Sequence, residues 1–318
     1  MRFLLNTEQR AFADSLDAML TAADTPVVVR DWSRGEHTSG RALWRRIAEA
    51  GVFALAVPEA YEGLGPRPVE LAVAFVELGR HAVPGPLVET VTAAALLTDA
   101  GPAKRLLPSL ASGGTMATVA LDDAYALDGD VARARLTVAA DGLRLAPGHG
   151  PVRPSLDPAR RLTLLAPGGE LLTPAPPLGH ALTWARLATA AQALGVGLAL
   201  LDKTVAYVKQ RAQFGVPIGS FQAVKHRLAD AKIALEFARP LVFGAALTMT
   251  GEEVAAAKVT ACEAAYATAR TALQLHGAIG YTAEYDLSLW LTKARALRTA
   301  WGDPDECRAA VLSGDRRW

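Results

Sequence analysis

Apolar and polar residues follow two different patterns along this chain, a helical one at both ends and a strand-like one between them. In the first part, apolar residues recur three and four positions apart, the spacing that places them on one face of a helix. Proline and glycine interrupt this spacing where helices are expected to end. The sequence predicts helices over residues 7–23, with Thr7 as N-cap, and over 40–50, 68–82 and 86–100.

Between residues 113 and 180 the pattern changes to an alternation of apolar and polar residues. Segments such as ARLTVAADGLRLA and RRLTLLAPGGELL are separated by glycine, proline and aspartate turns. This alternation is typical of strands with one buried face. We therefore expect a small β domain that ends in a proline-rich linker, LLTPAPPLG.

Helical spacing returns after Leu182 and persists to the C-terminal region. It predicts helices over residues 183–213, 220–249, 251–277 and 283–299. Long helices with short connections favour an antiparallel four-helix bundle. The predicted fold is mainly α with a small β domain: an N-terminal helical domain (1–112), a reduced middle β domain (113–180) and a C-terminal four-helix bundle (181–318).

Composition limits the function classes. The formal net charge is +1 over 318 residues, with no long run of one sign, so a nucleic-acid partner is not expected. The two cysteines, Cys262 and Cys307, have no metal-ligand or disulfide spacing, and we expect reduced, structural thiols and no metal site. No charged-then-apolar leader and no apolar run of membrane-spanning length are evident, which predicts a cytosolic protein without membrane contact.

A glycine–proline break at residues 215–219 is flanked by side chains that suit a flat, phosphate-bearing heteroaromatic ligand. Guanidinium groups pair with phosphates, aromatic rings stack on such a ligand, and amides match its polar edges. The candidate residues are Arg211, Gln213, Phe214, Phe221 and Gln222. Residue types alone favour a plainer interpretation, a capped interhelical loop in which both phenylalanines fill the core.

A second candidate segment, QLHGAIGY at residues 274–281, lies at the junction of two predicted helices. Gly277 and Gly280 allow a ligand to approach the backbone closely, and exposed N–H groups there suit phosphate oxygens. Gln274 and His276 stand beside them. Taken alone, this glycine spacing is more typical of a helix C-cap, and a lone histidine is more often structural than a catalytic base.

The run Q-F-G-x-x-I-x-x-F-Q at residues 213–222 closely resembles the signature of the flavin-dependent acyl-CoA dehydrogenases. Residues 274–281 resemble the segment of that family that meets the flavin dinucleotide across a subunit interface, although Ala278 stands where a second glycine is common. The segments GVFALAVPEAYEGLG and VELAVAFVELGRH follow the family's first domain in order. The resemblance implies an acyl-CoA substrate and an FAD cofactor whose adenine and pyrophosphate are contacted by both candidate segments.

The catalytic base of the resembled family has no counterpart in this chain. That base is a glutamate before a glycine near the C-terminus or, in some relatives, a residue directly before an arginine in the first bundle helix. Trp301 and Ala185 occupy these positions, and neither accepts a proton. The acidic residues near enough to replace it are Asp303, Asp305, Glu306 and Glu284. The two family loops that hold the flavin ring are also missing from residues 113–180.

These features together resemble the short subunit of heterotetrameric, actinobacterial steroid-type acyl-CoA dehydrogenases. The resemblance implies that a full-length partner subunit carries the catalytic carboxylate, while this chain completes the partner's FAD site for the α,β-dehydrogenation of an acyl-CoA such as a steroid side chain. Three alternatives stay open. They are a homodimeric dehydrogenase with a displaced acidic base, a flavin-free acyl-CoA-binding or scaffold protein of the same fold, and a flavin enzyme of this fold with oxygen chemistry.

Overall fold

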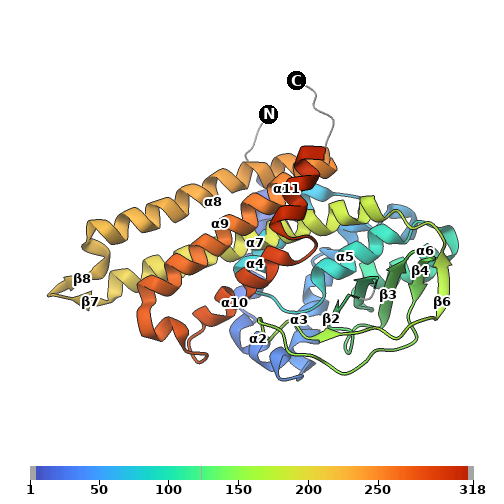
Figure 1. Ribbon diagram of the computed structural model, residues 1–318, viewed down its shortest axis with the longest axis horizontal. Coiled ribbons are helices and arrows are strands. Elements are labelled where there is room, and N and C mark those ends of the chain that lie inside the picture. The colour runs from blue at the N-terminus through green and yellow to red at the C-terminus, as the bar shows by residue number, and fades with distance from the viewer. Residues whose placement is uncertain (1–4, 123, 314–318) are drawn as a thin grey trace.

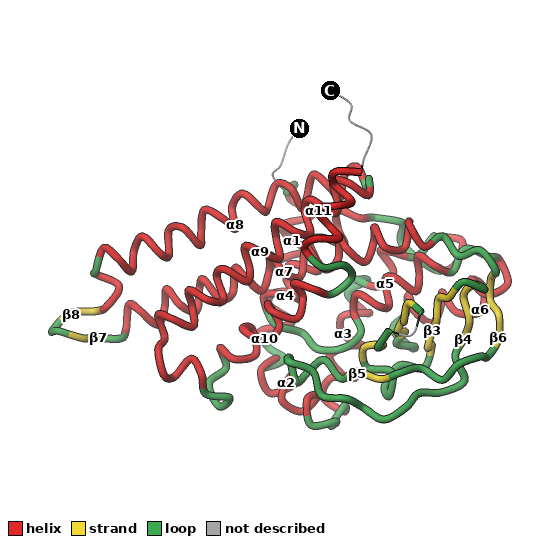
Figure 2. The backbone as a smooth tube through the Cα atoms, viewed as in Figure 1, coloured by secondary structure: helices red, strands yellow, loops and turns green. Residues whose placement is uncertain are grey.

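The computed structural model describes residues 5–122 and 124–313 and confirms the predicted fold class. Helices come first, a small sheet follows, and long helices complete the chain (Figure 1). The sheet lies at one end of the molecule beside α5 and α6 (Figure 1). Apart from one short hairpin at the opposite end, the strands are confined to this region (Figure 2).

The N-terminal domain contains more helices than the apolar pattern predicts. Asn6, not Thr7, is the first N-cap, because its side chain accepts the Gln9 N–H while the Gln9 side chain accepts the Asn6 N–H. The predicted helix over 86–100 ends early and a separate helix follows, and one short helix was not predicted at all. The helices are α1 (Thr7–Thr21), α2 (Thr25–Ser33, not predicted), α3 (Thr38–Glu49), η1 (Phe53–Ala56), η2 (Glu59–Tyr61), α4 (Pro68–Arg80), α5 (Leu87–Leu96) and α6 (Ala100–Ala111).

The middle domain is a four-stranded sheet in the order β1-β3-β4-β6, with a separate antiparallel pair, β2–β5. β1 and β3 are parallel, and β3 alternates buried and partly exposed residues as predicted. The predicted linker over 171–179 is wrong in part, because its first residues form an edge strand and its last begin a helix. The strands are β1 (Ala117–Leu121), β2 (Ala126–Leu127), β3 (Ala134–Ala139), β4 (Gly142–Leu145), β5 (Leu162–Thr163) and β6 (Glu170–Thr173).

The C-terminal domain is built around α7, whose most apolar window is 94% buried inside the protein. By length and composition α7 could cross a membrane, so the prediction about apolar runs is wrong, but its burial makes it the core helix of this domain. Both cysteines are buried free thiols, as predicted. The elements are α7 (Leu178–Gln210), β7 (Ala212–Gln213), β8 (Val216–Pro217), η3 (Ile218–Ser220), α8 (Gln222–Thr248), α9 (Gly251–His276), η4 (Gly277–Tyr281), α10 (Leu287–Thr299) and α11 (Pro304–Ser313, not predicted).

Two glycines allow α4 of the N-terminal domain to touch the backbone of α7. A Cβ atom on Gly195 would lie 1.9 Å from the Val76 carbonyl oxygen, and one on Gly79 would lie 2.0 Å from the Gln192 carbonyl oxygen. Real atoms do not approach so closely, and backbone has little freedom to move aside in a packed core. The contact therefore fixes how the two helical domains meet.

Replacing Gly195 with alanine is expected to lower the free energy of unfolding by at least about 2 kcal/mol, because the added methyl group forces α4 away from α7. Urea denaturation followed by circular dichroism measures this loss. Gly179→Ala in the same helix is the matched control, since no atom lies within 4 Å of its added Cβ and alanine is the better helix former. Equal effects of the two substitutions would contradict the close-contact model.

Candidate functional site

A cavity of about 400 Å³ lies where the three domains meet, beside Trp301. Its walls come from α5, β1, β2, the loop before β5, α7 and the segment that joins α10 to α11. Most wall residues are apolar, and a few polar side chains converge on the same space. This combination is typical of small-molecule sites. The charged residues that line the cavity are Glu89, Arg160, Arg186 and Glu306.

The α10–α11 segment that carries Trp301 is held in an unusual backbone conformation. Trp301 has φ +58°, a left-handed value that side chains rarely adopt. Its carbonyl oxygen accepts a hydrogen bond from Arg186 Nε at 3.1 Å, and its indole Nε1 donates to Glu89 Oε1 at 3.3 Å. These contacts tie the segment to α7 and α5, so the strained residue is fixed from two sides.

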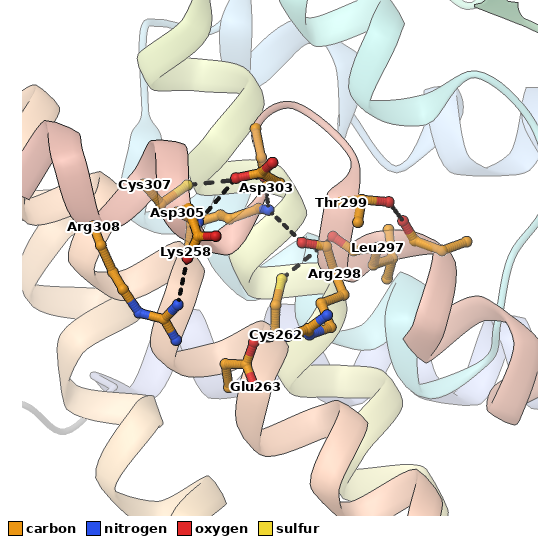
Figure 3. A network of polar contacts seen from close by, with 12 residues as sticks. Lys258, Cys262, Glu263, Leu297, Arg298, Thr299, Asp303, Asp305, Cys307 and Arg308 are labelled. Carbon is orange, nitrogen blue, oxygen red and sulfur yellow. Dashed lines mark hydrogen bonds and ion pairs between the residues drawn. The ribbon is translucent and has the colours of Figure 1, made fainter.

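Lys258 supports the same segment from α9 (Figure 3). Its side chain is fully buried, and its ammonium donates to the Arg298 carbonyl oxygen at 2.9 Å and to the Gly302 carbonyl oxygen. A cation at the carbonyl end of α10 is favourably placed against the helix dipole. Because a buried charge without such partners is costly, the loop geometry and Lys258 depend on each other.

The two positions expected to hold a base lie close together at this cavity, and neither is acidic. Ala185 is fully buried in α7, and the next residue, Arg186, donates to the Trp301 carbonyl oxygen. Trp301 itself lines the cavity. The structure thus brings the α7 position and the α10–α11 position to one place and provides no proton acceptor at either side chain.

The acidic residues proposed as replacements are occupied elsewhere. Asp303 accepts the backbone N–H groups of Asp305 and Glu306, both at 2.8 Å, and Glu306 Oε2 accepts the Asp303 N–H at 2.8 Å. This is a reciprocal cap of α11, and the hydrogen bond from the Glu306 N–H is the main reason why the pKa of Asp303 lies below its usual value. The Asp305 side chain is 93% exposed and Glu284 is exposed, so among the four only Glu306 lines the cavity.

Glu89 is a carboxyl group in the cavity that the sequence analysis missed. It lies on α5, is 3% exposed and forms the hydrogen bond with Trp301. Burial raises the pKa of its carboxyl above the usual value. The signal was present in the sequence, because Glu89 is the one charged residue in the apolar run LVETVTAAALL, and such a residue in a core needs a polar partner.

The first predicted ligand segment forms the exposed hairpin β7–β8 between α7 and α8 (Figure 2). Phe214 and Gly215 both have positive φ, as in a two-residue turn, and the Phe214 side chain is 91% exposed at the tip. Its ring lies 6.3 Å from that of Phe221 in an edge-to-face arrangement. Arg211, Gln213 and Gln222 are exposed as well, so the plainer interpretation, in which both phenylalanines fill the core, is wrong.

The second predicted segment lies beside the base of that hairpin. His276 is buried, donates from Nδ1 to the Ala272 carbonyl oxygen at 2.8 Å, and stacks on Tyr207 of α7 with ring centroids 4.1 Å apart. Burial lowers the pKa of this histidine. Gln274 Oε1 accepts from Arg227 Nη1 at 2.8 Å, which links α9 to α8. Stacking and a hydrogen bond therefore connect the second segment to α7 and α8, the two helices that flank the hairpin.

The glycines of this segment differ in their surroundings. Gly280 is buried against Leu273 and His276, whereas Gly277 has φ +65° and open space where a Cβ would be. The exposed amides, guanidinium and rings of the hairpin and the open backbone at Gly277 fit a dinucleotide, the kind of group that FAD contains. None of these nine predicted residues lines the cavity at Trp301 within the described parts of the chain.

Residues 6–114 match the family model of the acyl-CoA dehydrogenase N-terminal domain, and residues 178–311 match that of the acyl-CoA dehydrogenase C-terminal domain. The chain is 35% identical over 306 residues to the acyl-CoA dehydrogenase IpdE2 of Mycolicibacterium smegmatis, which covers 95% of this chain and 97% of that protein. Among solved structures, the ChsE4-ChsE5 complex from Mycobacterium tuberculosis superposes with a TM-score of 0.84 at 26% identity, covering 98% of both chains. The Tcur3481-Tcur3483 steroid ACAD variant gives 0.80 at 26%, covering 96% of both.

A second buried carboxyl, Asp128, lies close to the cavity wall. Trp32 Nε1, on the helix that was not predicted, donates to its Oδ1 at 3.1 Å, and its Oδ2 has no partner among the described residues. Burial, with a smaller contribution from the nearby carboxyls of Glu89 and Asp130, raises the pKa of Asp128 to about 8. The folded protein therefore holds a proton that the unfolded chain releases near its usual pKa of about 3.9.

Between about pH 4 and pH 8 the folded state thus binds more protons, and the free energy of unfolding is expected to fall as the pH rises through this window. Asp128→Asn removes this contribution and flattens the pH dependence. Chemical denaturation at pH 5 and pH 8 compares the two proteins, with the exposed Asp99→Asn as control. If the free energy of unfolding changes equally with pH in the unmodified protein and in both variants, the carboxyl of Asp128 is ionised in the folded state.

Proposed function

Because this chain belongs to the acyl-CoA dehydrogenase family, we propose that it is the noncatalytic subunit of a heteromeric acyl-CoA dehydrogenase. In this proposal a full-length partner carries the carboxylate that removes the α-proton of an acyl-CoA. The present chain completes the partner's FAD site with its β7–β8 hairpin and glycine turn. The assembly operates in the cytosol.

The observation that carries this proposal is the separation of the two sites within one chain. The predicted nucleotide-contacting residues gather around the hairpin at the C-terminal end of α7, whereas the cavity at Trp301 is lined by residues near the N-terminal end of α7. Figure 1 shows the hairpin and the sheet at opposite ends of the molecule. In this proposal, a dinucleotide bound at the hairpin of this chain has its reactive ring in another subunit's cavity. We therefore propose that the hairpin contributes residues to the FAD site of a partner subunit.

The second support is chemical. Bound FAD supplies the hydride acceptor, but the reaction also needs a base for the proton beside the thioester. In this chain Trp301 and Ala185 stand at the base positions, and three of the four nearby acids point to solvent or cap a helix. Arg211, Gln213, Phe214, Phe221, Gln222, Gln274 and Gly277 would contact FAD, while His276 and Gly280 are buried and would hold the turn in place.

The substrate we propose is a bulky acyl-CoA, such as the CoA thioester of a steroid side chain. Support comes from the similarity to the Tcur3481-Tcur3483 steroid ACAD. The full-length likeness to the ChsE4-ChsE5 complex supports pairing with a second, different subunit.

Purified alone, this chain is expected to be colourless, and co-purified with a full-length acyl-CoA dehydrogenase subunit it is expected to form a yellow complex that oxidises acyl-CoA. Visible absorbance, size-exclusion chromatography and an electron-acceptor assay measure the three properties. The first partner to test is one encoded beside this chain. An active, flavin-saturated protein made only of this chain would overturn the proposal and favour the homodimeric alternative.

Replacing Phe214 with alanine is expected to weaken FAD retention by the complex roughly tenfold, because an exposed ring at a ligand or subunit contact often contributes this much. The melting temperature of the isolated chain should not change, since the ring is already exposed. Leu64→Ala, an exposed apolar residue outside the hairpin, is the control. Unchanged flavin content in the Phe214 variant would remove the hairpin from the FAD site.

A further inference from the structure

The cavity at Trp301 contains two guanidinium groups, although neither of the expected base positions, Ala185 and Trp301, is acidic. Arg186 is half-buried and uses its Nε for the Trp301 carbonyl oxygen. Arg160 is also half-buried, and its guanidinium has no hydrogen-bond or ion-pair partner within 4.0 Å in residues 5–122 and 124–313. A partly desolvated cation without a carboxylate partner is uncommon unless it receives an anion from outside.

The two hollows that meet at Arg160 differ in their lining, which is more apolar in the cavity at Trp301. Leu121, Leu127, Leu162 and Leu182 line the cavity of about 400 Å³. A second hollow of about 560 Å³ shares Arg160 with it and extends toward α9 and α10. Arg160 thus lies at the junction of the two, where a ligand could place an anionic group while its apolar part lies against the leucines of the first cavity.

The cavity is preformed by contacts that do not involve Arg160. The Trp301 indole is bound to Glu89, and Lys258 holds the carbonyl groups of the α10–α11 segment. Glu89 is already hydrogen-bonded and buried, and Glu306 accepts the Asp303 N–H. Neither carboxylate forms an ion pair with Arg160, so the guanidinium remains available to a ligand.

We propose that this cavity binds a small apolar carboxylic acid, with the carboxylate on Arg160 and the hydrocarbon part against the leucines. A carboxylate fits because a single planar guanidinium binds it with two parallel hydrogen bonds. A polyphosphate needs several free cations, whereas the other guanidinium in the cavity at Trp301, that of Arg186, already donates to the Trp301 carbonyl oxygen. The site is independent of the hairpin and of the proposed FAD contact.

The test is isothermal titration calorimetry of the full chain, without flavin or partner, using octanoate and 1-octanol as probes. Octanoate is expected to bind at least about tenfold more tightly than octanol, which has the same chain without the charge. Arg160→Gln should abolish this preference, whereas Arg153→Gln, an exposed arginine in the same loop that does not line the cavity, should keep it.

A second variant keeps the test informative if the Arg160→Gln protein does not fold. Leu162→Trp fills the apolar part of the cavity and should remove binding of both probes, with folding checked by circular dichroism. Equal affinity for octanoate and octanol, or equal losses in the Arg160 and Arg153 variants, would overturn the proposal, as would unchanged octanoate binding in the Leu162 variant. Because no partner is present, these outcomes are separate from those of the subunit proposal.

Discussion

The contact of α4 with α7 is the constraint on which the rest of the structure depends. Gly79 and Gly195 place the two helix backbones in direct contact, and no larger residue fits at either position without displacing a carbonyl group. α7 is therefore buried against the N-terminal domain along one side while it packs α8 and α9 on others. The hairpin follows the C-terminal end of α7 at Gln210, and the cavity lies beside Arg186 near its N-terminal end.

Buried polar groups define the cavity that apolar packing leaves open. Glu89, Arg186 and Lys258 come from three different helices, and each bonds to the segment around Trp301. Their side chains would lose free energy on burial without these bonds, and the left-handed backbone at Trp301 would relax without them. The segment thus keeps a fixed shape even though its central residue performs no proton transfer.

The sequence predicted what periodicity encodes, namely the helical regions at both ends of the chain and the strand-like middle. The sequence-based prediction was wrong or incomplete where contacts between residues far apart in the chain determine the local structure. Asn6 replaced Thr7 as N-cap because the reciprocal bond with Gln9 needs that register, and α2 was missed because its stability comes from Trp32 packing and bonding to Asp128, far along the chain. Glu89 and Arg160 were missed because only the fold brings them to Trp301. The exposure of Phe214 likewise follows from the turn and not from its residue type.

Under the proposed function, the separation of hairpin and cavity favours one of two ways of pairing. In a pair of identical chains, each hairpin would reach the cavity of the other copy, and both cavities would contain Trp301 in place of a base. The exposed amides and rings of the hairpin would then serve two sites without a proton acceptor at the expected positions. In a pair with a different subunit, the same hairpin reaches a cavity that has its carboxylate, and the cavity of this chain is released from catalysis. We infer that only the unequal pair gives the exposed hairpin a catalytic use.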